Sequence, residues 1–356
     1  MHDTEVLIVG AGIAGASLAA ALASRRSVTL VEAEAQPGYH STGRSAAFWH
    51  EGYGGPLVAP LTRASRPLLE AGGYLDPRGA IHLARPGEEI ALVEGVAVRP
   101  LSRAELEERL PGLAPSWTHG ALEEGLADID VARLHADALA TARRAGARVR
   151  TSAAFAAATR LAAGGWSVRL ADGTAITAGL IVDAAGAWGD DVAANCGIAP
   201  LGLAPKRRTM VQLRLGRTGL RRLPLVVGAD GSFYFKGEGD RTIWLSPHDE
   251  IDSAPCDAAP EELDVAIAID RFQHVVDWPI EKVERRWAGL RTFTPDRVPA
   301  IGVDPAEPGF FWCVGQGGFG IQTAPAAAQL GAALILGDSD LPAGVEPGTY
   351  DPARFR

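Results

Sequence analysis

Apolar residues at the start of the chain are arranged as a strand, a turn and a helix. We expect a short buried strand over Glu5–Val9, a tight turn over Gly10–Gly15 and an alanine-rich helix over Ala16–Ser24. A second apolar strand is predicted over Ser27–Glu32. This β-turn-α-β order within about 30 residues is typical of the mononucleotide-binding half of a doubly wound, Rossmann-type parallel sheet.

The same kind of pattern returns later in the chain. Gln36–Ala47 is polar and broken by Pro37 and glycines, and we expect a loop or helix start near a ligand. The later elements expected in the first fold are helices over Asp130–Ala145 and Thr323–Leu336, strands over Arg148–Ser152, Leu180–Ala184 and Gly309–Val314, and a hairpin of Trp166–Leu170 with Ala175–Thr177 across Asp172-Gly173.

Two intervening segments show a different pattern. Residues 56–125 are rich in Pro and Gly and contain one capped surface helix, Ser102–Leu110. Within residues 201–284 we expect strands over Met210–Leu215, Phe233–Lys236 and Thr242–Leu245 and a helix over Glu261–His274. The fold prediction is therefore α/β. A discontinuous doubly wound domain comprises residues 1–55, 126–200 and 285–356, and an antiparallel β-rich substrate domain comprises 56–125 and 201–284.

The composition of the chain limits the classes of protein to which it can belong. At 356 residues the chain is long enough for two domains, and its net charge of −9 is spread along the sequence, which argues against a nucleic-acid partner. The cysteines Cys196, Cys256 and Cys313 lie far apart, which predicts neither disulfides nor a metal site and fits a reducing cytoplasm. Glycines interrupt the apolar run Val6–Ala23, so we expect no transmembrane segment, although peripheral membrane contact stays open.

The first turn carries the dinucleotide fingerprint. Gly10 permits the turn, Gly12 lets backbone N–H groups approach a pyrophosphate, and Gly15 allows close helix packing. Glu32, about 20 residues further on at the end of the second strand, is placed to accept hydrogen bonds from ribose hydroxyls. The same half-fold binds NAD or FAD, so this motif leaves the cofactor undecided.

Three further segments favour FAD. The loop Ser41–Ser45 supplies donors soon after the ribose acid, and Val182–Trp188 puts small residues at a strand end. The turn Gly315–Gly320 repeats the strand, glycine turn and helix arrangement near the C-terminus. A helix N-terminus there could stabilise negative charge on a reduced flavin.

Long runs of the sequence resemble a known family. These are Ala35–Ala47, Pro200–Leu203, Pro205–Arg208, Trp287–Arg291 and Gly317–Thr323. With them the chain resembles the D-amino acid oxidase and dehydrogenase superfamily of flavoenzymes, and within it most closely the bacterial D-arginine dehydrogenases. The resemblance extends from the first strand to the C-terminal helix.

The resemblance implies a chemistry and a set of residues. It implies non-covalent FAD, since no cysteine stands beside Arg291, and oxidative deamination of a D-amino acid by hydride transfer from Cα to flavin N5. Arg208, Arg291, Tyr53 and Tyr234 would surround the substrate carboxylate. The candidate cofactor-binding residues are Gly10, Gly12, Ile13, Ala14, Gly15, Glu32, Ala33, Ser41, Thr42, Arg44, Ser45, Ala46, Ala47, Ala154, Ala185, Gly186, Trp188, Gly317, Gly318, Phe319, Gly320, Ile321, Gln322 and Thr323.

Side-chain chemistry supports part of this set independently. A guanidinium grips a carboxylate with two parallel hydrogen bonds, and the apolar surroundings of Arg291 make its burial costly without an anion. Arg208 follows two other cations, so the residues alone do not single it out. His50 is a candidate base for the substrate amine or a packed histidine. His40, His82 and Glu51 are equally undecided.

The chain departs from the D-arginine enzymes where substrate side chains are recognised. There a Glu two residues after a Pro-Arg pair binds the substrate guanidinium; here Pro77-Arg78 is followed by Gly79 and Ala80, while Phe48 and His50 replace His and Thr. Loss of a charge partner disfavours a cation. We therefore expect a small-molecule amino acid with a neutral or apolar side chain. The alternatives are glycine, a secondary amine, a 2-hydroxy acid, D-arginine in an altered pocket, or, from another class, a NAD-dependent dehydrogenase or a non-catalytic nucleotide-binding protein. The electron acceptor, whether oxygen, quinone or another, is not specified by the sequence.

Overall fold

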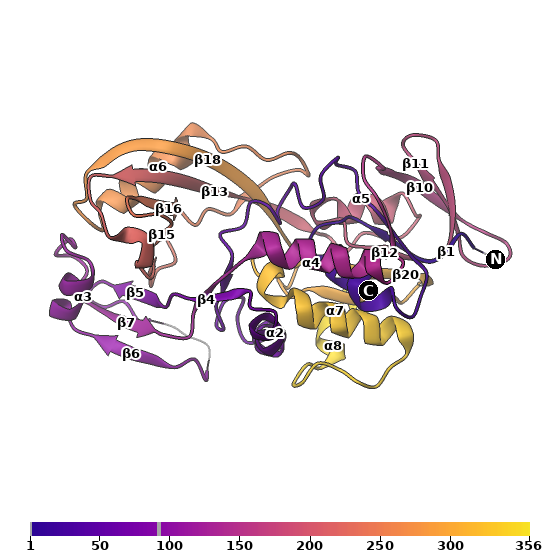
Figure 1. Ribbon diagram of the computed structural model, residues 1–356, viewed down its shortest axis with the longest axis horizontal. Helices are drawn as coiled ribbons and strands as arrows, with labels where there is room; N and C mark the ends of the chain where they lie inside the picture. Colours follow the sequence, from indigo (N-terminus) through magenta and orange to yellow (C-terminus); the bar gives the residue numbers. More distant parts are fainter. Residues whose placement is uncertain (1, 91–93) are drawn as a thin grey trace.

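The computed structural model describes residues 2–90 and 94–356 and contains two large β-sheets that lie next to each other along the longest axis of the molecule (Figure 1). A third, small sheet has the order β3 (Phe48–Trp49), β8 (Ala127–Ile129) and β4 (Leu75–Pro77). Both labelled chain termini lie in the half of the molecule that holds the first sheet (Figure 1).

The first sheet has a parallel centre in the order β9, β2, β1, β12 and β20. Antiparallel strands β10, β11 and β19 complete it. The bounds of its strands are β1 Thr4–Val9, β2 Val28–Val31, β9 Arg148–Arg150, β10 Phe155–Arg160, β11 Trp166–Leu170, β12 Ala175–Asp183, β19 Ala300–Asp304 and β20 Glu307–Val314.

Helices cover this sheet because its central strands are apolar on both faces. Along β1, Val6 and Ile8 pack in the core that also contains helix residues of α1 (Ile13–Leu22), α4 (Val131–Arg144) and α7 (Gly320–Leu336). Leu7 and Val9 point to the opposite face, into a core with residues of α5 (Gly189–Ala194). The chain therefore forms the doubly wound layer that its opening pattern predicts. The remaining elements on this side are η1 Gly186–Trp188, α2 Ala59–Ala71, α8 Pro347–Tyr350 and η3 Pro352–Phe355.

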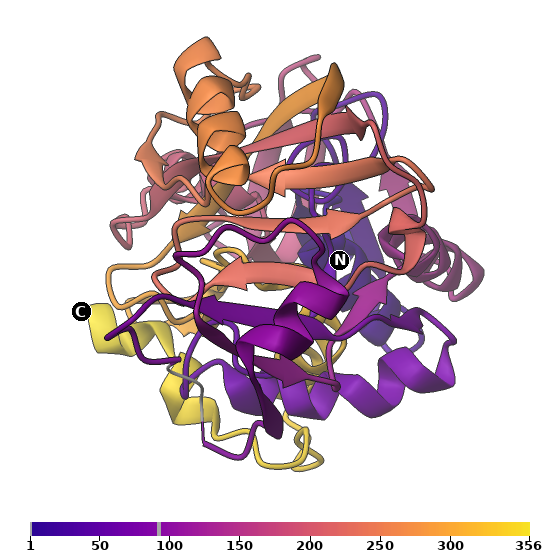
Figure 2. The same cartoon turned by 90° about the vertical axis from the view of Figure 1, so that its left-hand side faces the viewer.

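The second sheet is mainly antiparallel and has the strand order β17, β13, β16, β15, β14, β5, β7, β6, with β18 paired to β13. Figure 2 shows it in front, seen from the left of Figure 1. Helix α6 (Glu262–Gln273) packs on it through Val265, Ala268 and Phe272. The other bounds are β5 Ala80–Ala84, β6 Val98–Leu101, α3 Arg103–Arg109, β7 His119–Glu123, β13 Ala204–Leu215, η2 Leu220–Arg222, β14 Leu225–Gly228, β15 Tyr234–Gly237, β16 Thr242–Ser246, β17 Ile251–Asp252 and β18 Ile280–Phe293.

The element predictions hold better for the apolar parallel strands than for the rest. Helix α1 begins at Ile13, three residues before the expected start, and the predicted strands Ala175–Thr177 and Leu180–Ala184 are one continuous strand, β12. Several strands were not predicted, and β10 and β18 are two examples. Strand β10 is alanine-rich, and β18 begins with exposed charged residues that hide any alternation of apolar positions.

The predicted division into two domains can be followed in the sheets. Strands from residues 4–31, 148–183 and 300–314 build the first sheet, and strands from 80–123 and 204–293 build the second. Strand β18 crosses the predicted boundary at residue 285, because all of it pairs with β13 in the second sheet. The division itself stays a prediction. Among the residues that the structure describes, no helix is both long and apolar enough to cross a bilayer.

Candidate functional site

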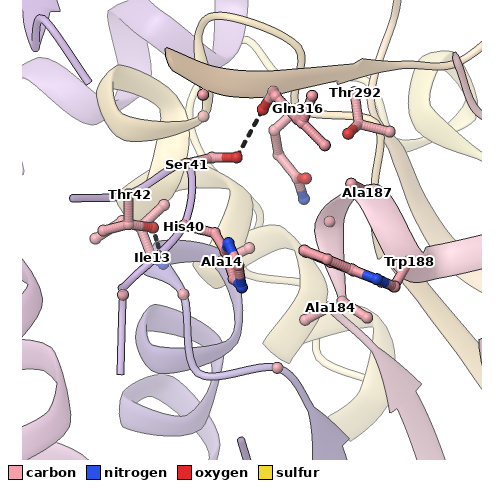
Figure 3. Close-up of a pocket in the computed structure, with 18 of the residues that line it drawn as sticks. Ile13, Ala14, His40, Ser41, Thr42, Ala184, Ala187, Trp188, Thr292 and Gln316 are labelled. Atoms are coloured by element: carbon pink, nitrogen blue, oxygen red, sulfur yellow. Dashed lines mark hydrogen bonds between the residues drawn. The ribbon is translucent and has the colours of Figure 1, made fainter. Parts of the chain in front are cut away.

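An elongated cavity of about 720 Å³ begins at the first glycine turn and ends beside two arginines of the second sheet. Its volume falls in the range of about 300–1,000 Å³ that small-molecule and cofactor sites occupy. Figure 3 shows its wall between Ile13, Thr42 and His40 on one side and Ala184 and Trp188 on the other. The rings of His40 and Trp188 lie 4.7 Å apart at this end of the cavity.

The first glycine turn is shaped by close backbone approach. Gly10 has a φ of +100°, and a Cβ on it would lie 2.5 Å from the carbonyl oxygen of Ala184. A Cβ on Gly15 would lie 2.0 Å from the carbonyl oxygen of Gly10. Only glycine fits at these two positions, and helix α1 can therefore begin directly at the cavity wall. The predicted roles of Gly10 and Gly15 in the turn and in packing agree with this geometry.

Polar side chains hold the turn and the following loop in place. Glu32 accepts hydrogen bonds from the backbone N–H of Ala11 at 2.8 Å and of Glu34 at 3.0 Å. Thr42 Oγ1 accepts from the N–H of Ile13 at 3.0 Å, and Ser41 Oγ donates to the carbonyl of Leu290 at 2.6 Å (Figure 3). The loop therefore connects the start of α1 to strand β18.

The second glycine turn lies at the other end of the cavity. Helix α7 begins at Gly320, and no side chain caps its first turn. A Cβ on Gly318 would lie 2.3 Å from the hydroxyl oxygen of Tyr53, so this position has room only for hydrogen. An uncapped helix N-terminus presents free N–H groups and a partial positive charge to whatever lies in front of it.

The cavity has the features that a bound FAD requires. One end has a glycine turn, the start of α1 and the Glu32 carboxylate, which suit a pyrophosphate and a ribose. The other end has the start of α7 and two guanidinium groups, where a flavin ring and an anionic substrate would meet. A single continuous cavity joins these ends, as an extended dinucleotide needs.

Most of the predicted cofactor residues line this cavity, and some do not. The lining residues are Gly10, Gly12, Ile13, Ala14, Glu32, Ala33, Ser41, Thr42, Arg44, Ser45, Ala154, Ala185, Gly186, Trp188, Gly317, Gly318, Gly320 and Ile321. Six others are not among the lining residues: Gly15, Ala46, Ala47, Phe319, Gln322 and Thr323. Gln322 and Thr323 are buried, and their side chains bond Thr62 and Phe319 of the protein itself.

Arg44 binds protein groups as well as lining the cavity. Its guanidinium donates to the carbonyl groups of Ala258 at 2.8 Å and Ala288 at 3.0 Å and forms an ion pair with Asp257. This anchors the loop to β18 and to the segment that precedes α6. Other lining residues were not among the predicted cofactor residues, and they include Tyr39, Phe155, Asn195, Met210, Thr292 and Gln316. Tyr39 and Gln316 lie in segments that were expected near the ligand, whereas the other four come from separate strands and helices that no spacing rule joins.

Four of the five predicted catalytic residues lie close together, and hydrogen bonds join three of them. Arg291 Nη1 donates to the hydroxyl of Tyr53 at 2.9 Å, and its Nη2 donates to the hydroxyl of Tyr234 at 3.3 Å. Arg208 lies on the neighbouring strand β13, opposite Gly289, so its side chain shares a face with Arg291. Arg208 bonds Glu250 Oε1 at 3.1 Å and the carbonyl of Asp249, while its Nη1 is buried without a partner.

The positive charges of Arg208 and Arg291 favour the binding of an anion at this network. Burial lowers the pKa of Arg208, and the positive charge of Arg291 lowers it further. Burial opposes ionisation of Tyr234, but the two guanidiniums outweigh it and lower the pKa of that phenol. Burial and Arg208 lower the pKa of His248 to about 3, so this imidazole is neutral near pH 7. A carboxylate beside the two arginines would relieve the repulsion between them and bond the free Nη1.

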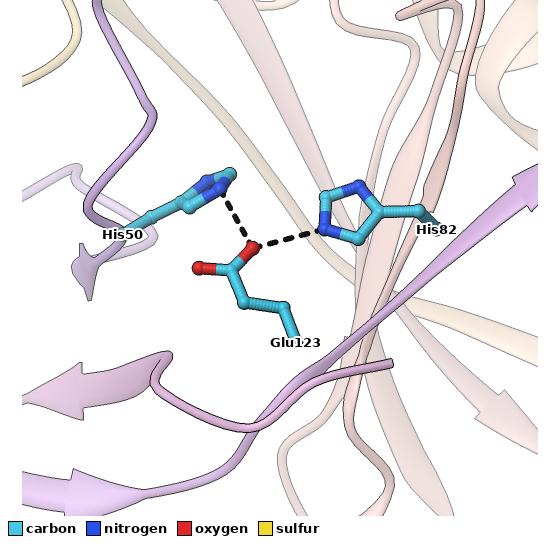
Figure 4. A group of neighbouring side chains, drawn as sticks. All are labelled: His50, His82 and Glu123. Carbon is cyan, nitrogen blue, oxygen red and sulfur yellow. Dashed lines mark hydrogen bonds and ion pairs between the residues drawn. The ribbon is translucent and has the colours of Figure 1, made fainter. Parts of the chain in front are cut away.

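His50 lies apart from this network, in a second cavity of about 1010 Å³ that Tyr53 separates from the first. Tyr53 lines the second cavity, while its hydroxyl contacts Arg291 in the first. The Nε2 atoms of His50 and His82 lie 3.0 Å and 2.9 Å from the same oxygen of Glu123 (Figure 4). Burial opposes ionisation of Glu123, but the imidazoles lower its pKa to about 2. Ala80 stands at the position where the D-arginine enzymes carry the Glu that binds the substrate guanidinium. It lies directly opposite Glu123 where strands β5 and β7 pair.

Comparison with known proteins agrees with this geometry. Residues 5–334 match the family model described as FAD dependent oxidoreductase (DAO). The chain is 29% identical to a glycine oxidase of Pseudomonas aeruginosa over 98% of each chain. Solved structures with a similar fold include L-proline dehydrogenase from P. horikoshii, with a TM-score of 0.84 and 22% identity over 99% of this chain and 98% of that one. Glycine oxidase from Geobacillus kaustophilus has a TM-score of 0.82 and 22% identity over 99% of both chains.

The fold and the cavity thus define a dinucleotide-binding oxidoreductase. More particularly, the chain belongs to the DAO family of FAD-dependent oxidoreductases, and FAD is its cofactor. The expected family, cofactor and enzyme class are confirmed. The closer resemblance to D-arginine dehydrogenases stays a prediction, because the relatives named above are glycine oxidases and a proline dehydrogenase.

Proposed function

We propose that this protein catalyses the oxidative deamination of a D-amino acid with a neutral or apolar side chain. The product is an imino acid, which water hydrolyses to a 2-oxo acid and ammonia. The observation that carries the proposal is the pair of guanidiniums at the end of the cofactor cavity, that of buried Arg208 and that of half-buried Arg291. FAD, when bound, supplies the chemistry that accepts the α-hydrogen and two electrons.

The residues of the chain bind and orient the substrate in this proposal. Arg291 and Arg208 grip the α-carboxylate, and the hydroxyls of Tyr53 and Tyr234 hold the Arg291 guanidinium in one orientation. This fixes the amino acid at the carboxylate and leaves its Cα and amine free to face the cavity. Such positioning supplies much of the rate enhancement that a hydride-transferring flavoenzyme needs.

The preference for a neutral or apolar side chain rests on the surroundings of Tyr234. Tyr234 belongs to an apolar cluster with Ala80 and Met210. The ring of Phe48 lies edge-on to the Tyr234 ring, with 6.3 Å between the two ring centroids. These groups are uncharged and offer a substrate side chain dispersion contacts. D-Leucine, D-methionine and D-phenylalanine are substrates of this kind.

A smaller or secondary amine is the second candidate. It is favoured by the names of the relatives, which include glycine oxidases and a proline dehydrogenase, since glycine has no side chain and proline is a secondary amine. The same carboxylate site would serve these substrates.

An anaerobic screen of flavin reduction tests the proposal. The purified holoenzyme is mixed with D- and L-amino acids, glycine, sarcosine and 2-hydroxy acids, and loss of flavin absorbance is followed. We expect D-amino acids with neutral side chains to bleach the flavin fastest. Bleaching by glycine or sarcosine alone would favour the second candidate, and bleaching by none of the D-amino acids would refute the proposal.

The variant Arg291→Ala tests the carboxylate site. Loss of one buried charged hydrogen-bond partner costs about 2–4 kcal/mol, so we expect KM for the best amino acid to rise about 30- to 1,000-fold. The flavin spectrum should persist. Arg285→Ala, which removes an exposed arginine from the same strand, is the matched control. Equal kinetic constants for the two variants would exclude Arg291 from the site.

A further inference from the structure

His50, His82 and Glu123 form a cluster that the reaction proposed above does not use. His82 lies on β5, Glu123 at the end of β7, and His50 directly follows β3 (Figure 4). Their ligating atoms all lie within 4.8 Å of one another. We propose that this cluster binds a divalent transition-metal ion of the Zn²⁺ or Co²⁺ type.

The distances suit a metal with little rearrangement. In a tetrahedral site with metal–ligand bonds of about 2.0–2.1 Å, neighbouring ligand atoms lie about 3.3 Å apart. Both imidazole Nε2 atoms already lie within 0.4 Å of that separation from Glu123 Oε2, at 3.0 Å for His50 and 2.9 Å for His82. The ligand atoms of the two imidazoles lie within 4.8 Å of each other. Side-chain shifts that bring all three separations to about 3.3 Å would place a cation between the three atoms.

The hydrogen bonding of the cluster is incomplete without a cation. His82 is aligned to share a hydrogen bond with the Glu123 carboxylate, but the buried Nε2 of His50 has no hydrogen-bond partner despite its short distance to that carboxylate. Within residues 2–90 and 94–356, no Lys or Arg forms an ion pair with Glu123, which is 1% exposed. A buried carboxylate with one poorly aligned imidazole neighbour gains more from a bound cation than an exposed carboxylate does.

Rigid elements hold the three side chains. Glu123 pairs with Ala80, and His82 with Ala121, in the β5–β7 ladder. The N–H of His50 donates at 3.1 Å to Gln322, whose own amide is held by Thr62 at 2.8 Å. A ligand set on strands and on an anchored loop keeps its geometry better than one on free loops.

The donor set and the cavity select the kind of ion. Two imidazoles and one carboxylate suit zinc, cobalt, nickel and iron(II), whereas Mg²⁺ and Ca²⁺ prefer oxygen ligands only. His50 and His82 also line the second cavity, so water can occupy the remaining coordination positions. Since His50 lies three residues before Tyr53, the ion would tie the loop of that tyrosine to the second sheet.

Metal content and affinity of the holoenzyme test this inference without reference to activity. The protein is stripped with chelator, dialysed against Zn²⁺ or Co²⁺ and analysed for metal, and Zn²⁺ binding is measured by calorimetry. We expect one ion per chain and, for His82→Asn and Glu123→Gln, affinity at least about a hundredfold weaker. His274→Asn and Glu124→Gln remove an exposed imidazole and an exposed carboxylate and serve as matched controls.

A second measurement guards against variants that fail to fold. Flavin absorbance and the unfolding temperature of each variant report its integrity, and crystals of the wild-type protein soaked in Zn²⁺ are measured at the zinc absorption edge. An anomalous peak between the three side chains is expected. The inference would be overturned if that peak were absent and less than one ion bound per chain. It would also be overturned if the cluster variants and the controls bound Zn²⁺ equally well.

Discussion

At the residue scale, Asp183 is a buried acid whose surroundings disfavour its charged form. It is fully buried at the end of β12, where Oδ1 accepts from the N–H of Ala185 at 3.0 Å and Oδ2 has no partner. Burial raises its pKa well above the usual value. Its neutral form is thus favoured in the folded state, so its stabilising contribution is complete below the ordinary aspartate pKa of about 4 and is lost as the pH rises through the raised value.

The raised pKa of Asp183 predicts how the stability of the wild-type protein compares with that of Asp183→Asn, whose side chain is uncharged at every pH. The wild-type unfolding temperature should fall relative to that of the variant as the pH is raised from about 5 to about 8. Thermal unfolding followed by circular dichroism at several pH values measures the difference. Parallel curves for the two proteins would mean that Asp183 does not titrate in this way.

At the scale of elements, the start of α1 depends on contacts that a sequence motif only implies. Alanine in a helix is favoured over glycine by about 1 kcal/mol, yet a Cβ on Gly15 would lie 2.0 Å from the carbonyl oxygen of Gly10. The steric overlap outweighs the propensity, so we expect Gly15→Ala to lower FAD content and stability. Flavin absorbance per chain measures the effect. Gly348→Ala, where a Cβ would meet no atom within 4 Å, is the control, and equal flavin content in both would be the contrary result.

At the scale of the molecule, the FAD cavity joins the two sheets. Its wall combines the β1–α1 turn of the first sheet with Arg208 and Arg291 of the second. A ligand that binds only the folded state at about 100 times its Kd adds about 2.7 kcal/mol of stability. We expect FAD to raise the unfolding temperature of apoprotein. FMN lacks the adenosine that we assign to the Glu32 end of the cavity, so it should raise the unfolding temperature less than FAD does. Equal increases with FMN and FAD would contradict the assignment of adenosine to the Glu32 end.

Local patterns were sufficient where a function depends on neighbours in sequence. The glycine turn with its strand, helix and Glu32 could be predicted because one strand, one turn and one helix bring those residues together. Arg291 could be picked out by its apolar neighbours. Residues that are not among those lining the cavity, such as Gln322 and Ala46, were assigned to the cofactor from the resemblance alone. The sequence does not reveal which side of a loop faces a cavity.

The amino-acid sequence by itself determined the doubly wound sheet, the cofactor end of the cavity and the family, because these follow from short-range periodicity and from long matched runs. Only the tertiary structure brought Arg208 next to Arg291 and gathered His50, His82 and Glu123 around one point. Those contacts join strands that are far apart in sequence. Pairing register and loop anchoring, which no local pattern encodes, decide them.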